Sequence, residues 1–335
     1  MIVKGTPIIN GCSFCYIVVS KPGAWKLPGF VLGHAPRGHK FEKERESMKK
    51  NVSALVLSVA LTLSLAACSE NPSAGGTPSD GASPAVTTPA ASPSAAPEAP
   101  AAEPLGGEVL ADFSNGAVEA MFPSDGWSNG SVFNVWWTGS NVTYSDGQLH
   151  LGITPAGDEV EQDYYGSEMR TGLYYGYGDY SVSMKPSKDA GTASTFFTCT
   201  GPYDVVDGEP NPWDEIDIEF LGKDTTGVQF NYYVDGQGGH EYWYELGFDA
   251  SEEFHEYGFR WEENSITWFV DGEAVYSVNT EDNGPMPSTP GRILMNFWCG
   301  TEDAEGWMGE YTAESSQADY QWVKTSAQGA ELGAE

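Results

Sequence analysis

Basic side chains are scarce in this chain. Its 335 residues include 16 Lys and Arg against 48 Asp and Glu. Nine of these 16 and three of these 48 precede Cys68, so the remainder carries 7 basic and 45 acidic residues, a net charge of −38. Such a surface repels nucleic acid and anionic lipid, which excludes a nucleic-acid partner. It is compatible with an uncharged ligand, although the solubility of an exported protein also explains most of this charge.

Long apolar stretches and histidine-based metal patterns are also missing. The apolar run at residues 55–67 is too short to cross a membrane comfortably. His150, His240 and His255 are scattered, without Cys or carboxylate partners at ligand spacing. We therefore expect these histidines on the surface or in loops, with no metal site among them.

The apolar run has the features of a secretory signal at residues 48–68. It follows Met48-Lys49-Lys50 and ends in small residues before Cys68. These small residues resemble a bacterial lipobox, in which the cysteine is lipidated and becomes the new N-terminus. We expect an extracytoplasmic protein, either a cell-surface lipoprotein that touches the membrane only through a lipid on Cys68 or a secreted protein. An ordinary signal with an incidental cysteine is the alternative.

Composition divides the rest of the chain. Residues 1–47 precede the signal and show no clear periodicity, so we hypothesise that translation begins at Met48 and that they are an artefactual extension. Residues 69–105 are rich in Ala, Pro and Ser and cannot bury enough apolar surface to fold, which predicts a disordered linker. The folded domain is expected over 106–326, as a monomer, with a flexible tail at 327–335.

No long helical period appears in residues 106–326. Aromatic and β-branched residues alternate with polar ones instead, and turn signals such as Asp146-Gly147 and Asp271-Gly272 separate these stretches. Many short strands predict an all-β sandwich or barrel. The alternation places four aromatic residues in its core: Tyr257, Phe259, Trp261 and Trp268.

Three carboxylates stand at alternate positions in residues 213–220. As a β-strand, this stretch turns Glu215, Asp217 and Glu219 to one face and both isoleucines to the other. A row of like charges is retained where it has a use, and the alternatives are a solvated strand face or a calcium site. Because side chains four positions apart lean toward each other, the outer carboxyls can reach the ~5–5.5 Å separation of retaining glycosidases. One must be ionised as the nucleophile while the other is a protonated acid, and the spacing alone does not assign these roles.

The sequence around the row resembles the bacterial lichenases of glycoside hydrolase family 16. The resemblance runs from about Phe133 to Val323 and includes the stretches at residues 177–178, 184–186, 196–198, 213–226, 228–233, 246–250, 268–272 and 290–296. It implies a curved, concanavalin-like β-jelly roll of two antiparallel sheets, with a cleft across the concave sheet. It also implies Glu215 as nucleophile, Glu219 as general acid/base and Asp217 as electrostatic helper of the nucleophile.

The resemblance further implies a substrate. The laminarinase branch of the family inserts one residue before the last glutamate, and this chain does not, which favours the endo-acting hydrolysis of mixed-linkage β-1,3-1,4-glucan. This chemistry requires no cofactor. The alternatives are a β-1,3-glucanase or xyloglucan-active enzyme of the same family, and a non-catalytic cell-surface glycan-binding protein.

Sugar rings stack on exposed aromatic faces, so some aromatic residues should line the cleft. The resemblance implies ten substrate-binding residues: Trp127, Asn129, Glu168, Arg170, Phe197, Trp213, Asn231, Tyr233, Asn296 and Trp298. For Glu168 and Arg170, a surface ion pair of little energetic value is the alternative.

The chain departs from the family in three places. A disulfide of the relatives is absent, because Val135 and Gly166 occupy its positions. Cys199 and Cys299 form a possible disulfide instead, which the sequence does not decide. Gln321 stands where relatives supply a calcium-binding aspartate, which makes a structural calcium possible but doubtful. The loop at 203–212 is longer than usual and borders the expected cleft, where it either alters a subsite or is a neutral insertion.

Overall fold

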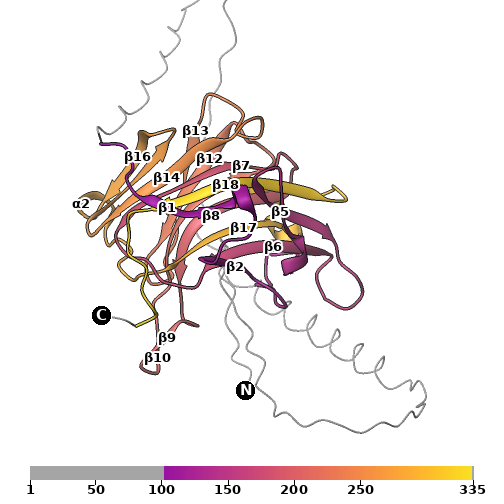
Figure 1. Ribbon diagram of the computed structural model, residues 1–335, viewed down its shortest axis with the longest axis horizontal. Coiled ribbons are helices and arrows are strands. Elements are labelled where there is room, and N and C mark those ends of the chain that lie inside the picture. The colour runs from indigo at the N-terminus through magenta and orange to yellow at the C-terminus, as the bar shows by residue number, and fades with distance from the viewer. Residues whose placement is uncertain (1–101, 334–335) are drawn as a thin grey trace, which may run out of the picture. The chain divides into compact units, whose positions relative to one another are not determined.

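Two curved layers of antiparallel strands form the part of the chain that the computed structural model describes, residues 102–333 (Figure 1). In the first layer the strands follow the order β13 (Tyr242–Glu245), β12 (Gly227–Tyr233), β11 (Asp214–Leu221), β8 (Thr192–Thr200), β17 (Arg292–Cys299) and β6 (Tyr164–Thr171), with β2 (Met121–Pro123) also beside β6. In the second they follow the order β5 (Gln148–Pro155), β18 (Ser316–Thr325), β7 (Gly178–Lys185), β14 (His255–Glu262), β15 (Ser265–Val270) and β16 (Glu273–Asn279).

Short elements complete these layers. β1 (Glu108–Asp112) pairs with β18, β4 (Val142–Ser145) with β5, and β3 (Val135–Trp137) runs parallel to β6. A pairing between β5 and β6 connects the two layers. Helices are single turns: α2 (Thr280–Asn283), α3 (Glu305–Met308), η2 (Phe113–Asn115), η3 (Gly139–Asn141) and η4 (Glu302–Ala304). The predicted all-β sandwich of two antiparallel sheets is confirmed.

Aromatic side chains fill the space between the layers. Phe230 of β12 stacks on Trp268 of β15 with ring centroids 5.4 Å apart, and Phe220 of β11 meets Tyr257 of β14 edge-on at 4.7 Å. The four aromatic residues predicted for the core are all buried. The alternation of these strands therefore specifies the core, as expected for half-buried sheets.

Two hydrogen bonds cross the core to the backbone of the first layer. The Trp268 indole N–H donates to the Asp217 carbonyl oxygen over 3.1 Å, and the Tyr320 hydroxyl donates to the Thr195 carbonyl oxygen over 3.0 Å. Both donors are buried. They connect β11 and β8 to the second layer and so fix the distance between that layer and the sheet that carries the carboxylate row.

The predicted tight turns are present. Asp271 and Gly272, at φ of 48° and 82°, join β15 to β16, and Asp146 and Gly147, at 50° and 75°, join β4 to β5. Two successive residues with positive φ form the turn that matches the twist of a two-residue hairpin. Glycine at the second position has no Cβ to oppose this conformation.

The expectation of surface or loop positions was wrong for His150, whereas the side chain of His255 is partly exposed. His150 lies in β5, is buried, and its Nδ1 is 2.7 Å from Asp319 Oδ1 of β18. His255 lies in β14 with its Nδ1 2.7 Å from Asp271 Oδ2. The carboxylate partners are far away in sequence, and pairing of the strands brings them close.

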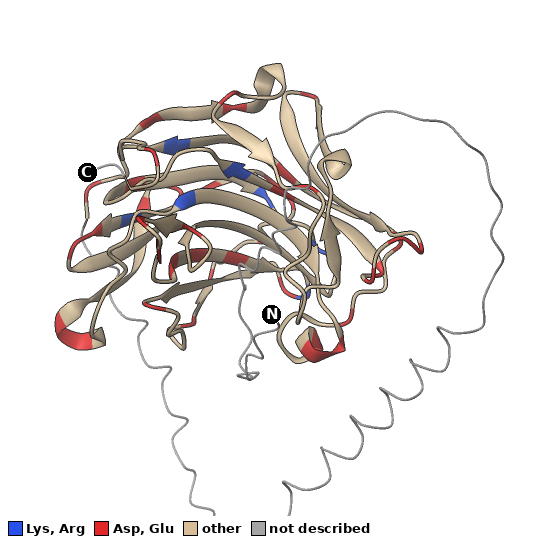
Figure 2. Cartoon of the chain, turned by 90° about the horizontal axis from the view of Figure 1, so that it is seen from below, with Lys and Arg blue, Asp and Glu red and all other residues tan. Residues whose placement is uncertain are grey.

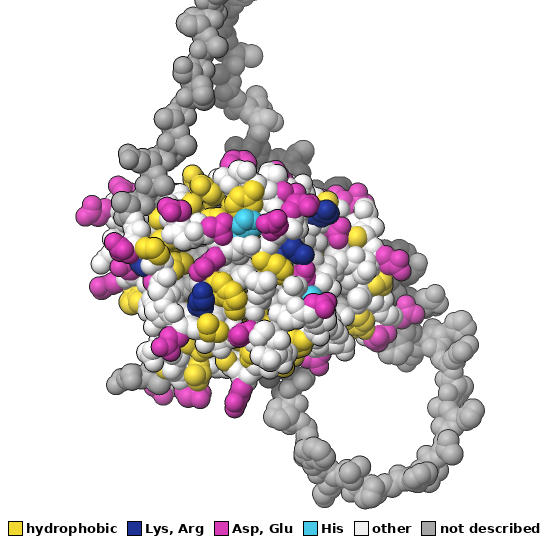
Figure 3. Space-filling view, turned by 45° about the horizontal axis from the view of Figure 1, so that its top comes forward, with side chains coloured by type: hydrophobic (Ala, Val, Ile, Leu, Met, Phe, Trp, Pro, Cys, Tyr) yellow, Lys and Arg dark blue, Asp and Glu magenta, His cyan; other side chains and the backbone are white. Residues whose placement is uncertain are grey.

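Acidic residues are distributed over loops, short helices and strands, and the few Lys and Arg lie mainly on strands (Figure 2). On the face in Figure 3, acidic side chains surround scattered apolar ones without one dominant patch. Among residues 102–333, no helix has the length and apolar character needed to span a membrane. Contacts continue past position 326, because Ala330 pairs with Tyr174. The predicted signal, Cys68 and residues 69–101 of the linker lie outside the described residues.

Replacing Tyr320 with Phe tests the bond across the core. This substitution removes one buried hydroxyl and leaves the ring, so the free energy of unfolding should fall by about 1 kcal/mol. Urea unfolding measures the change, with Tyr177→Phe at an exposed position as the matched control. Equal effects of the two substitutions would show that the bond contributes nothing to stability.

Candidate active site

The carboxylate row lies on β11, the strand between β8 and β12. The two isoleucines and Phe220 of β11 lie in the core between the layers. Because a strand alternates, Glu215, Asp217 and Glu219 point to the opposite face of the sheet, as the sequence predicted. The hydrogen-bonded register to both neighbouring strands is unbroken along the row. The row therefore has no bulge and sits on a rigid support.

The neighbouring strands place further predicted residues beside the row. In β12, Tyr233 is opposite Glu215 and Asn231 is opposite Asp217. In β8, Phe197 is opposite Asp217. All three side chains are buried. Residues from three strands thus surround the carboxylates.

Glu215 is held by the residue two positions before it. The Trp213 indole N–H donates to Glu215 Oε2 over 3.0 Å, and the same ring stacks on Tyr233 at 4.7 Å between centroids with 8° between planes. Burial raises the pKa of Glu215 to about 7, and the charge of Glu168 adds to the increase. Hydrogen bonds from Cys199, Trp213 and Asp217 oppose it. Burial therefore makes Glu215 harder to ionise than an exposed glutamate.

Asp217, between the two glutamates, also has a raised pKa. Burial is the largest cause that raises its pKa well above the ordinary value, followed by the charges of Glu215 and Glu219. Desolvation thus raises the pKa of Asp217 more than the repulsion between neighbouring carboxylates does. A neutral Asp217 donates a hydrogen bond to Glu215 and keeps three negative charges from standing side by side.

Glu219 is oriented by two residues that sequence reasoning missed. Gln229 Nε2 donates to Glu219 Oε2 over 2.7 Å, and Gln229 Oε1 accepts from the Trp307 indole N–H over 3.0 Å. Gln229 could have been predicted, because it alternates with Asn231 and Tyr233 along β12 and so shares their face of the sheet. Trp307 follows in a separate short helix, α3, and no sequence pattern connected it to the row.

Glu168 and Asn296 form a second polar group on the same sheet. They are opposite each other in β6 and β17, and Asn296 Nδ2 donates to Glu168 Oε2 over 3.4 Å. The Ser124 hydroxyl also donates to Glu168, and Thr195 Oγ1 donates to Asn296 Oδ1 over 2.6 Å. Burial raises the pKa of Glu168. Glu168 is buried, so the alternative of a surface ion pair with Arg170 is wrong.

Arg170 lies between two aromatic rings. Its guanidinium carbon is 5.5 Å from the Phe122 ring centroid and 5.7 Å from that of Trp127. Asn129, near Trp127 in the chain, is buried, and its Oδ1 accepts from the Trp137 indole N–H over 2.6 Å. The amide nitrogen of Asn129 is the group that this arrangement leaves for a ligand.

The two remaining predicted aromatic residues differ in their surroundings. Phe197 packs with Cys199, Leu294 and Trp213 in a small cluster separate from the main core. Trp298 shares the Asn296 face of β17 but is fully buried and belongs to the main core cluster. A sugar therefore reaches Trp298 only if the side chains that cover it move.

The possible disulfide between Cys199 and Cys299 does not form. Cys199 of β8 is opposite Arg292, whereas Cys299 of β17 is opposite Thr192. The two cysteines thus lie at opposite ends of one antiparallel pair, roughly 23 Å apart at ~3.3 Å per residue. A disulfide requires Cα atoms about 4.4–6.8 Å apart, so both remain thiols.

The possible calcium position has no carboxylate. Gln321 Oε1 accepts a hydrogen bond from Ser183 Oγ over 2.8 Å. Within residues 102–333, no three His, Cys, Asp or Glu side chains are arranged to hold a metal ion. Gln321 is thus engaged within the protein, and its neutral amide is a weaker calcium ligand than the aspartate of the relatives.

Replacing Glu215 with Gln should stabilise the fold at high pH. The pKa of Glu215 is raised in the folded chain, so its contribution to stability is present below about pH 4.5 and is lost as the pH rises through about 7. The free energy of unfolding of the variant does not fall for this reason as the pH rises. It should therefore exceed that of the unmodified chain by at most about 3 kcal/mol at pH 8. Urea unfolding at pH 5 and pH 8 measures it, with the exposed Glu263→Gln as control. A constant difference would contradict the raised pKa.

Comparison with known proteins places this site in a family. The family model described as glycosyl hydrolases family 16 matches residues 129–324, more than half of the chain. The chain is 49% identical over 203 residues to the beta-glucanase of Paenibacillus macerans, covering 60% of this chain and 80% of that protein. It is 45% identical over 227 residues to a xylanase/beta-glucanase of Ruminococcus flavefaciens, covering 66% of this chain and 27% of that protein.

Solved structures agree. A beta-1,3-1,4-glucanase (lichenase) from a mouse hindgut metagenome is 46% identical with a TM-score of 0.60, over 64% of this chain and 96% of that one. The beta-glucanase of Bacillus licheniformis is 42% identical with a TM-score of 0.59, over 65% of this chain and 97% of that one. The unbroken acidic strand, its aromatic neighbours and these similarities lead to one conclusion: the chain belongs to glycosyl hydrolases family 16.

Proposed function

We propose that the chain is an endo-acting, retaining glycoside hydrolase that cleaves mixed-linkage β-1,3-1,4-glucan. The observation that carries the proposal is the acidic row on β11, with its register to β8 and β12 intact. The relatives named beta-glucanase, at 45–49% identity, support a β-glucan substrate. The solved lichenase at 46% identity supports the mixed linkage.

Glu215 and Glu219 divide the chemistry between them. Glu219 donates its proton to the glycosidic oxygen as that bond breaks, and the Glu215 carboxylate attacks the anomeric carbon from the other side. The resulting glycosyl-enzyme ester is then hydrolysed by a water whose proton passes to Glu219. Two inversions give retention. Carboxylates and water supply every step of this reaction.

The neighbours of the row prepare these roles. Trp213 holds one oxygen of Glu215 and a neutral Asp217 donates to the same carboxylate. Both bonds favour the ionised nucleophile against the burial that opposes it. Gln229 fixes the orientation of Glu219. Asp217, whose raised pKa favours its neutral form beside Glu215, is thus the electrostatic helper of the nucleophile.

Further residues on the same sheet are proposed to bind the glucan. The stacked Trp213 and Tyr233, Phe197 and the guanidinium of Arg170 supply flat faces of the kind on which sugar rings pack. Trp127, Asn129, Glu168, Asn231, Asn296 and Trp298 complete the proposed set. Glu168 and Asn296 are already bonded to each other, which holds both in place before a sugar arrives.

Other substrates and activities are less well supported. The laminarinases among the solved structures are 20–21% identical, which indicates a common fold only. A β-1,3-glucanase or xyloglucan-active enzyme remains the enzymatic alternative. A non-catalytic glycan-binding protein does not require two buried glutamates on either side of an aspartate, each oriented by its own hydrogen bond.

We further propose that the chain is exported and attached to a membrane by a lipid on Cys68, or secreted. The basic start, the apolar run at 55–67 and the small residues before Cys68 support this proposal. The Ala-, Pro- and Ser-rich residues 69–105 would then separate the enzyme from the membrane.

Reducing-sugar release from a panel of β-glucans tests the function. We expect rapid release from lichenan and cereal β-glucan and at least tenfold slower release from laminarin and xyloglucan. Glu215→Gln should lose activity on all of them, because an amide does not form the glycosyl-enzyme. Faster release from laminarin would move the specificity to β-1,3-glucan, and product formation by the variant would refute the role of Glu215.

A further inference from the structure

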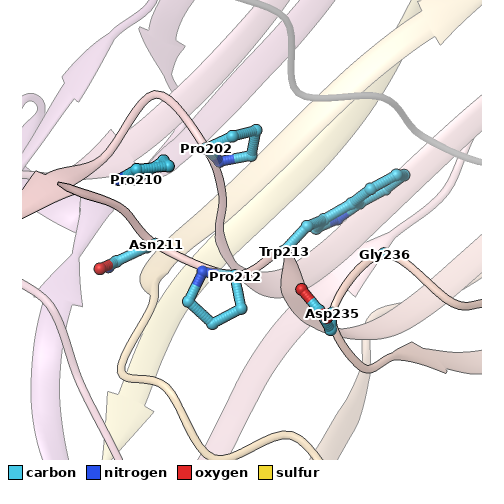
Figure 4. Close-up of a pocket in the computed structure, with 7 residues that line it drawn as sticks. All are labelled: Pro202, Pro210, Asn211, Pro212, Trp213, Asp235 and Gly236. Carbon is cyan, nitrogen blue, oxygen red and sulfur yellow. The ribbon is translucent and has the colours of Figure 1, made fainter.

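A hollow of about 580 Å³ lies next to Trp213, on the side of the longer loop. It is lined by Pro202, Pro210, Asn211, Pro212, Trp213, Asp235 and Gly236 (Figure 4). This volume is within the ~300–1,000 Å³ range of small-molecule sites. Trp213 lines the hollow and also donates to Glu215, so one side chain links the hollow to the surroundings of the proposed nucleophile.

The loop that forms one wall is a built hairpin. β9 (Val205–Val206) pairs with β10 (Glu209–Pro210), and Asp207 and Gly208 between them have φ of 53° and 90°. This pair of positive φ values is the turn that two-residue hairpins favour. The extra residues thus have a defined conformation.

The base of the hairpin is anchored to the domain. Asp204 accepts hydrogen bonds from the Tyr174 hydroxyl, from Thr200 Oγ1 over 3.2 Å and from the Gly201 backbone N–H over 3.2 Å. Asn211 returns to the same place, with its N–H bonded to the Asp204 carbonyl oxygen over 2.9 Å and its Nδ2 to Thr200 Oγ1 over 3.1 Å. A wall held in this way loses little conformational entropy when a ligand binds.

The opposite wall is the turn after β12. Asp235 has φ of 48°, and its N–H donates to Asp214 Oδ1 over 3.0 Å, while the Gly236 N–H donates to the Trp213 carbonyl oxygen over 2.8 Å. These bonds hold the backbone of the turn, and Asp235 lies beside Trp213 (Figure 4). An ionised carboxylate accepts hydrogen bonds from hydroxyl groups.

The lining combines rigid apolar rings with one carboxylate. Three proline rings and an indole present C–H and π faces with little rotamer entropy to lose, and this suits the C–H face of a pyranose. Asp235 supplies the polar group that fixes orientation, as is usual in ligand sites. We propose that this hollow is an accessory subsite for one further sugar unit of the glucan, with Asp235 as the residue that binds its hydroxyls. The proposal rests on the proposed function.

Binding to an inactive enzyme tests the subsite directly. Calorimetry on the Glu215→Gln chain would use a length series of mixed-linkage β-glucan oligosaccharides. Adding Asp235→Gly removes the carboxylate, and glycine suits the φ of 48°. Oligosaccharides long enough to enter the hollow should bind about tenfold more weakly to the double variant, and the shortest ones equally well to both. Adding Asp207→Asn instead, at the exposed hairpin tip, should change nothing.

The active enzyme provides the kinetic counterpart. Asp235→Gly alone should raise KM for the polymer about tenfold with kcat unchanged, because the sugar is bound equally in the ground and transition states. Equal affinities of Glu215→Gln with and without Asp235→Gly at every oligosaccharide length would overturn the subsite while hydrolysis by the unmodified chain stands. Absence of hydrolysis on every β-glucan would overturn the proposed function instead.

Discussion

The burial of one face of β11 in the core determines where the carboxylates on its other face point. Its isoleucines and Phe220 pack between the layers, and Trp268 of the opposite layer donates to the backbone carbonyl of Asp217. A shift of one residue in register would place carboxylates in the apolar core, at a cost that no fold of ordinary stability tolerates. The same packing that stabilises the sandwich therefore orients the two glutamates proposed for catalysis.

The row is tolerated because its charge is reduced and its oxygens are bonded. A protonated Asp217 separates Glu215 from Glu219, Trp213 binds one end and Gln229 the other. Burial still raises the pKa of Glu215 to about 7. The ionised form that a nucleophile requires therefore lowers the stability of the fold at this position. Preorganised donors of this kind are a common source of catalytic power.

Local alternation made much of this predictable. Residues 213–220 specify a strand with two faces, and the aromatic residues Trp261 and Trp268 specify the core, because period-two burial depends only on neighbours in sequence. Register between distant strands was not predictable, and it decided the rest. It separates Cys199 from Cys299 and brings Asp319 to His150. The position of the short helix α3, which places Trp307 against Gln229, was not predictable either. The anchoring of the 203–212 loop by Tyr174 was hidden for the same reason.

Trapping the glycosyl-enzyme tests the central claim most directly. We would use a mixed-linkage glucan oligosaccharide that carries fluorine at C2 of its reducing-end sugar and fluoride as the leaving group at C1. It should glycosylate the nucleophile with release of fluoride, and the ester should then hydrolyse slowly, because the fluorine at C2 destabilises the oxocarbenium-like transition state. Mass spectrometry of the digested protein should find the sugar on Glu215, on the face of β11 opposite the core. A sugar on Glu219, on another residue or nowhere, with the enzyme active, would contradict the account.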